Sequence, residues 1–239
     1  MLGWALREAR WRLIVGLVLA ITTPLWLPAD PSLRLWAVCA FVVLAPWLVL
    51  GRDARRIATG LREPLRGAQR LGRLVAIELV PAMGVLAVGA LVGSGGQPAA
   101  ALAIFAWGFF LVALADALDR RSARAGAAWI VVLAVVGVIA TAPLWLAGWF
   151  NTTYGHWPAT LSVGLHPAGA ALVGAGRVTL QDPVFYTWTL SGVVEVRALG
   201  WWPGTLLYLA LGALAYLASL YNARRPTVGF GAGARSITS

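Results

Sequence analysis

The sequence predicts an all-α membrane protein with six transmembrane helices in a single domain that covers residues 1–225. Of the 239 residues, 60% are hydrophobic and only 12% are charged, whereas a soluble domain carries about 25% charged residues. Several apolar runs are long enough, at about 20 residues each, to cross a bilayer as helices. The expected spans are 12–28, 34–50, 72–92, 98–118, 126–149 and 201–221.

The distribution of arginine predicts which side of the membrane each loop faces. All nineteen basic residues are arginine, and sixteen of them lie in the two terminal regions or in the loops after the second and fourth spans. Only Arg34, Arg177 and Arg197 lie on the opposite side. Because short arginine-rich loops stay in the cytoplasm, we expect both termini to be cytoplasmic. The small, polar tail over residues 226–239 is expected to be disordered.

Residues 150–200 form the one long region between spans, and this topology places them outside. The region is too apolar for a solvated loop, so we expect re-entrant or interfacial helices before the sixth span. Trp201 and Trp202 mark the outer end of that span, where indole rings favour the membrane interface. His156 and His166 are the only histidines, and we interpret them as structural residues of turns, because two histidines without a nearby cysteine make a weak metal site.

Glu78 is an acidic residue that falls within a predicted span. An ionisable group at such a depth is costly, and it usually faces protein or a water-filled cavity. Glu78 is therefore a candidate pathway or gate residue, and the alternative is an interhelical pair with an arginine near the inner face. Asp116 and Asp119 lie at the inner end of the fourth span beside two arginines, and we expect interface salt bridges there.

The composition argues against several kinds of chemistry. The chain has no lysine, so it cannot supply a phosphate-loop lysine or a Schiff-base lysine. Its net charge of +10 is explained by membrane topology, because the arginines lie in short loops between apolar runs, and no nucleic-acid partner is expected. No serine–histidine, paired-carboxylate or metal-ligand pattern occurs in or beside the spans, so we expect no catalytic, cofactor or metal site in this chain.

Seven arginines gather in one short stretch, "GRDARRIATGLREPLRGAQRLGRLV", at residues 51–75. Within it Ile57, Leu61 and Leu65 are four residues apart and would share one face of a helix over residues 51–70. A basic amphipathic helix of this kind can lie on anionic lipid headgroups. It can equally dock a cytoplasmic partner, and the pattern alone does not decide between the two.

The same stretch carries the first part of a family resemblance. "PLRGAQRLGRLVAIELV" holds a proline–leucine dipeptide at Pro64, followed by a glycine–arginine pair at Gly72 that opens the third span, and Asp53 lies upstream. This order is similar to that of permease subunits of the type-2 ABC exporter superfamily, which have a glutamate, a proline–leucine dipeptide and a glycine–lysine pair. Two departures are that Arg55 stands where the family often has glycine, and that the spacing from Pro64 to Gly72 is one residue short.

Two further stretches extend this resemblance over residues 5–225. "FFLVALADALDRRSARAGAAWIVVLAVV" at 109–136 is similar to the family's fourth span, basic turn and fifth span. "LHPAGAAL" at 165–172 resembles its outer proline motif, in which a partly buried segment precedes the last span. The predicted six-span order with cytoplasmic termini also agrees with this family.

The resemblance implies a permease subunit of an ABC transporter, in lipid of the bacterial inner membrane. It would form the translocation pathway with a second permease, either an identical copy or a related paralogue. A separate ABC ATPase, which binds ATP and magnesium, would drive it. Residues 52–66 would be the coupling helix between spans two and three. The expected ATPase contacts are Asp53, Arg55, Arg56, Arg62 and Glu63.

Two other functions stay open from the residues alone. An accessory or structural subunit of a larger membrane complex would share the same composition and topology. A membrane-embedded enzyme would need polar side chains that converge within the spans, and few are present. The presence of an ATPase partner separates the permease from both alternatives.

Overall fold

The computed structural model describes residues 98–121, 127–145, 164–175 and 199–224, with single positions elsewhere. The single positions are Ala68, Leu71, Gly72, Leu74, Val75, Glu78, Leu79, Ala82, Trp157, Thr160 and Leu161. These residues form helices and the turns at helix ends, and no strand occurs among them, which confirms the all-α class for this part of the chain. The predicted spans 12–28 and 34–50, the stretch 52–66 and the tail 226–239 lie outside the described residues.

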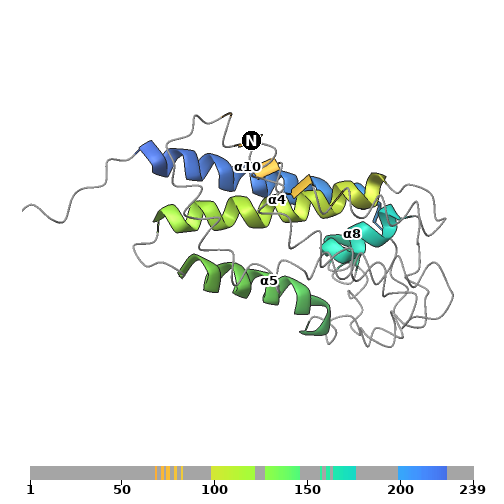
Figure 1. Ribbon diagram of the computed structural model, residues 1–239. Coiled ribbons are helices and arrows are strands. Elements are labelled where there is room, and N and C mark those ends of the chain that lie inside the picture. Colours follow the sequence, from red (N-terminus) through yellow and green to blue (C-terminus); the bar gives the residue numbers. More distant parts are fainter. Residues whose placement is uncertain are drawn as a thin grey trace, which may run out of the picture.

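Two long helices form the centre of the structure. Helix α4 covers Pro98–Arg121 and helix α10 covers Trp201–Arg224, in good agreement with the predicted fourth and sixth spans. The two lie side by side and run in the same direction (Figure 1). Two contacts agree with the parallel direction: Trp107 of α4 contacts Tyr208 of α10, and further along both helices Asp116 contacts Ser219.

Two other helices pack against this pair. Helix α5, Ala127–Trp145, lies within the predicted fifth span and runs back along α4 (Figure 1). The short helix α8, Pro167–Gly174, covers the ends at which α4 and α10 begin, and it contacts both of them. A helix therefore occurs within the region 150–200, as the sequence predicts.

Local sequence explains where these helices begin. α4 and α8 both begin at a proline, whose fixed φ and missing N–H group suit the first position of a helix. α10 begins directly after Gly200 and carries Pro203 in its first turn. Thr205 sits one turn further along and donates a hydrogen bond of 2.8 Å to the carbonyl oxygen of Trp201.

The core lies between α4, α10 and α8 and consists of aromatic and small side chains. Trp107, 2% exposed, is the largest fully buried side chain among the described residues. Its ring packs edge-on against Tyr208, with centroids 4.9 Å apart and an interplanar angle of 76°, and Phe110 packs against both rings. On its other side, α4 receives Val132 and Val136 of α5, which are four residues apart and share one helix face.

Within the described part of the chain, two helices are long and apolar enough to cross a membrane, judged by length and composition. They are Pro98–Leu118 of α4 and Trp201–Tyr221 of α10. Their surroundings differ. In α4, 78% of the apolar segment is buried inside the protein, whereas in α10 only 33% of the apolar segment is buried. Much of α10 therefore presents apolar side chains outward.

Candidate functional site

Polar side chains enter the apolar bundle at two levels along α4. Near the arginine-bearing ends of α4 and α10, Ser219 donates a hydrogen bond through Oγ to Oδ2 of Asp116. Both residues are buried, with Asp116 3% exposed and Ser219 fully enclosed. A buried carboxylate is stable only when hydrogen bonds compensate its lost hydration. The bond therefore ties the two central helices together by a polar contact.

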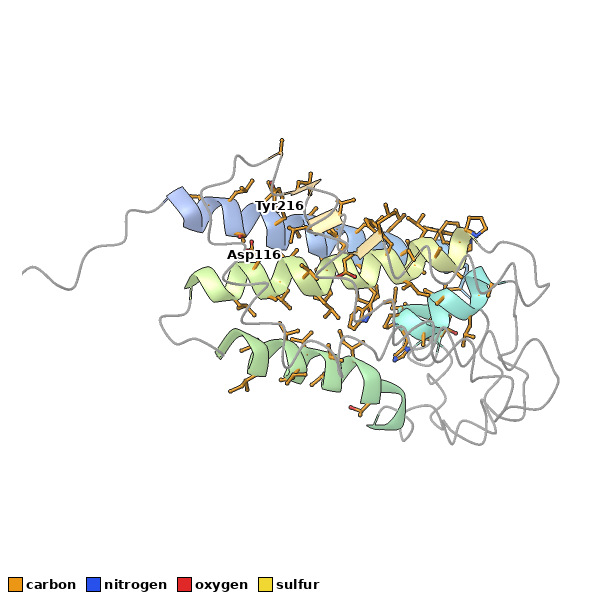
Figure 2. The ribbon with its side chains drawn as sticks, viewed as in Figure 1. Asp116 and Tyr216 are labelled. Carbon is orange, nitrogen blue, oxygen red and sulfur yellow. The ribbon has the colours of Figure 1, made fainter. Side chains whose placement is uncertain are left out.

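An aromatic and aliphatic cluster lies directly beside this pair. Tyr216, one turn before Ser219, packs with Phe109 and Val112 of α4 and with Leu74. Figure 2 shows Asp116 and Tyr216 where α4 and α10 face each other. Because Leu74 belongs to the stretch that follows residues 52–66, this cluster connects that part of the chain with both central helices.

Glu78 marks the second polar level. Its side chain is 3% exposed, and its carboxylate lies against Gly108 of α4, where an added Cβ would stand 1.8 Å from Oε2. The sequence predicts that Glu78 faces protein or a polar cavity, and the structure places it against protein. A role as a pathway or gate residue stays a prediction.

Close backbone approaches hold α8 on the opposite ends of the central helices. A Cβ at Gly204 of α10 would lie 2.9 Å from the carbonyl oxygen of Gly164, and one at Gly174 of α8 would lie 2.7 Å from the backbone nitrogen of Ala100. Small residues permit such approaches between helices. The Tyr208 hydroxyl adds a hydrogen bond of 2.9 Å to the carbonyl oxygen of Leu165, so α8 is fixed by packing and by a polar contact.

His166 caps the start of α8. Its Nδ1 accepts a hydrogen bond of 3.2 Å from the backbone N–H of Ala168, in agreement with its interpretation as a structural residue. Nε2 is buried and has no partner among the described residues, although the residue as a whole is partly exposed. Burial lowers the pKa of His166 to about 4, so the imidazole is neutral near pH 7 and Nε2 carries the proton.

Comparisons with protein-family models, with curated proteins and with solved structures found no match to this chain. The resemblance to type-2 ABC permeases therefore stays a prediction from sequence motifs.

The residues predicted to contact an ATPase are not among those described. Asp53, Arg55, Arg56, Arg62 and Glu63 all fall in the stretch 52–66, so their role stays a prediction. Among the described residues, no group of three or more His, Cys, Asp or Glu side chains could hold a metal ion. What the described residues form is a tightly packed junction of helices, with polar groups turned inward at two levels.

The sequence does not predict two parts of this junction. One is the hydrogen bond of Asp116 with Ser219, a residue 103 positions away, while the salt bridge expected between Asp116 and arginine stays a prediction. The other is Gly108, which accommodates Glu78. The signals for both were weak, since one is a serine in an apolar run and the other is one of 27 glycines.

Proposed function

We propose that this chain is the membrane-spanning permease subunit of an ABC transporter. Two permease subunits form the translocation pathway, and a separate ATPase supplies the energy. The chain itself performs no covalent chemistry in this role. Its work is to change between helix arrangements that the nucleotide state of the ATPase selects.

The observation that carries the proposal is the parallel packing of α4 and α10 with α8 over one end. In a six-span order the fourth and sixth spans run in the same direction. The basic residues at their ends, Arg120 and Arg121 of α4 and Arg224 of α10, then belong to the same side. The short helix α8, which overlaps "LHPAGAAL" from Pro167 onward, covers the other end, as the resemblance implies for a segment before the last span.

The outward surface of α10 supports a location in the membrane. Exposed side chains between Trp202 and Tyr221 are apolar, with Leu206, Leu214 and Leu217 each more than half exposed. Trp202 and Tyr221 are themselves 57% and 61% exposed. They are nineteen residues apart, which corresponds to about 28 Å along a helix, close to the roughly 30 Å of a hydrocarbon core. Aromatic residues at both ends of such a stretch are typical of the two membrane interfaces.

The deciding experiment is purification of the tagged protein from its native membrane, with a crosslinking amino acid at residue 58. We expect a nucleotide-binding ATPase to co-purify in a fixed ratio and to crosslink at this position. Asp53→Ala and Arg56→Ala should reduce its recovery and leave membrane insertion unchanged, because truncating one partner of a buried charge pair weakens an interface.

Other outcomes would favour the alternatives. A constant set of unequal membrane subunits, with no nucleotide-binding protein, would replace the permease proposal by the accessory-subunit function. Crosslinks from residue 58 to lipid alone would place the arginine-rich stretch on the membrane surface. In that case, neutralising any two arginines should weaken membrane contact about equally, whatever their positions.

A further inference from the structure

The Glu78 carboxylate occupies a recess that exists because residue 108 has no side chain. A Cβ atom at Gly108 would lie 1.8 Å from Oε2 and 2.7 Å from Cδ of Glu78. Real Cβ atoms do not approach other heavy atoms this closely, so an alanine at this position would force the carboxylate to move. Gly108 is also the central residue of the apolar span Pro98–Leu118, which places the carboxylate midway along it.

Glu78 is one of three residues on the same face of its own helical stretch. Leu74, Glu78 and Ala82 are four residues apart, so they share a helix face, and they are only 0%, 3% and 5% exposed. Leu79, about 100° further around the helix than Glu78, is 49% exposed. The buried face therefore rests on the central helices.

Leu74 anchors this face one turn away from Glu78. It is fully buried in the cluster formed with Phe109, Val112 and Ala113 of α4 and Tyr216 of α10. Leu74 thus contacts the junction of both central helices, while Glu78 fits the recess in α4. The pair of contacts fixes the rotation of the helical stretch around its axis and its position along α4.

Leaving this position would be unfavourable for an ionisable side chain. A rotation or a slide of the stretch would carry the carboxylate out of the recess, toward positions of α4 where a side chain stands in place of the missing one at Gly108. A rotation toward the outside of the bundle would place the ionisable group in the interior of the bilayer, which does not compensate the lost hydration of a carboxylate. The stretch and α4 should therefore move together rather than slide past each other.

We propose that the Glu78–Gly108 contact, with Leu74 beside it, transmits movement of residues 52–66 to α4 and α10. Residues 52–66 directly precede this stretch in the chain, and the proposal rests on their role as the ATPase-contacting helix. Gly108 is a positioning residue in this arrangement, because it acts through the side chain that it accommodates. The contact thereby deepens the proposed function, since it names the place where ATPase movement enters the bundle.

The contact itself is tested by a double-mutant cycle on the purified full-length protein. Gly108→Ala should lower the thermal midpoint by at least about 2–4 °C. The same change in a Glu78→Ala background should have little effect, because the added methyl group then has room. The matched control is Gly137→Ala on α5, where an added Cβ would meet no atom within 4 Å, and no decrease is expected. Equal decreases from Gly108→Ala in both backgrounds would overturn the contact.

The cycle stays decisive if Gly108→Ala prevents accumulation of the protein. Recovery of accumulation on adding Glu78→Ala would then support the contact. Failure of the double variant to accumulate, while Glu78→Ala alone accumulates normally, would overturn it.

Transmission is tested by ATP hydrolysis of the purified complex, expressed per bound ATPase. Gly108→Ala should reduce this rate several-fold while the amount of bound ATPase stays normal. The double variant Glu78→Ala/Gly108→Ala should recover its thermal midpoint but not its hydrolysis rate, because it lacks the contact. A purely structural contact would restore both together.

The two tests separate failure of this inference from failure of the proposed function. Unchanged hydrolysis in all variants, with a positive stability cycle, would overturn transmission and leave the contact as a packing feature. Absence of any ATPase from the wild-type preparation would overturn the proposed function and transmission with it. The stability cycle would still decide whether Gly108 accommodates Glu78.

Discussion

Ser219 of α10 donates a hydrogen bond to Asp116 of α4, and both side chains are buried in the interface between the two helices. The bond lies three turns beyond Tyr208, whose ring packs against Trp107 near the middle of α4. The long parallel contact between α4 and α10 thus has an aromatic junction near the middle of α4 and a polar junction toward the ends of both helices. The polar junction fixes the position of α10 along α4, because a displaced α10 would leave the Asp116 carboxylate without this donor.

Removal of the serine hydroxyl should destabilise the bundle. Ser219→Ala leaves the buried Asp116 carboxylate without this donor, so we expect a loss of about 1–3 kcal/mol in the free energy of unfolding. The measurement is denaturant or thermal unfolding of the purified protein. Thr141→Ala is the control, because the exposed Thr141 hydroxyl donates a hydrogen bond to the carbonyl oxygen of Gly137 in its own helix. Similar losses from both variants would show that the contact between helices is unimportant.

Glycines at the helix interfaces should respond to alanine according to the space beside them. A Cβ at Gly212 of α10 would lie 2.6 Å from Cδ1 of Phe109 and 3.2 Å from Cα of Phe110. Gly212→Ala should therefore cost about 1–3 kcal/mol by overpacking. Gly137→Ala has open space and should instead stabilise α5 by about 0.5–1 kcal/mol, because glycine is the poorer helix former. Thermal unfolding of both variants checks the opposite signs, and a stable Gly212→Ala protein would contradict the close packing of α10 on α4.

The positions of α4 and α10 could be predicted from the sequence, whereas their contacts could not. Each helix is an apolar run that begins beside proline and ends at arginine, and these local signals suffice to place a helix. The bond between Asp116 and Ser219 joins residues 103 positions apart. Its partners depend on which helices become neighbours, and the apolar pattern of a span does not encode that choice. The recess at Gly108 depends on the same arrangement, so a single sequence shows only another glycine.

For α8 too, the sequence predicts local structure but not the contacts with other helices. The sequence predicts helices within residues 150–200 and a structural role for His166, and the structure has α8 in this region with His166 as its N-cap. The capping bond from the Ala168 N–H follows from position, since His166 directly precedes Pro167. The hydrogen bond from Tyr208 to Leu165 does not follow, because it depends on α8 lying over the beginning of α10.

The cap of α8 should make the protein sensitive to mild acid. Burial lowers the pKa of His166 to about 4 from its ordinary value of 6.5, so the unfolded chain binds this proton more readily than the folded protein does. The contribution of neutral His166 to the free energy of unfolding is complete above pH 6.5. It is lost as the pH falls from 6.5 to 4, and the free energy of unfolding then decreases by up to about 3 kcal/mol. The protonated ring also loses the Nδ1 acceptor that caps the helix.

His166→Asn is the variant that isolates this effect. Asparagine can accept the same capping hydrogen bond but does not titrate. Thermal midpoints measured between pH 4 and pH 8 should fall more steeply for the wild type than for the variant. The difference between the two curves should develop below pH 6.5, since carboxyl groups contribute equally to both. Parallel curves would show that His166 has the same pKa in the folded and the unfolded protein.

The exposed face of α10 should reject a charge if it contacts lipid. Leu214 is 62% exposed and lies between Trp202 and Tyr221, away from both aromatic ends. In water, Leu214→Arg on an exposed surface would change stability by no more than about 0.5 kcal/mol. In a bilayer, an arginine near the centre of a span costs about 2.5–3.5 kcal/mol on insertion scales. We therefore expect much less Leu214→Arg protein in the membrane fraction and a lower thermal midpoint after extraction.

The depth of the charge provides the control for this experiment. Ala218 is also exposed but lies only three residues before Tyr221, and an arginine there can extend its guanidinium group to the interface. Ala218→Arg should therefore insert at nearly the wild-type level. If both variants accumulate and unfold like the wild type, this face of α10 contacts water, and the placement of the helix across a bilayer is wrong. If both fail equally, regardless of depth, a protein surface covers the face and lipid does not.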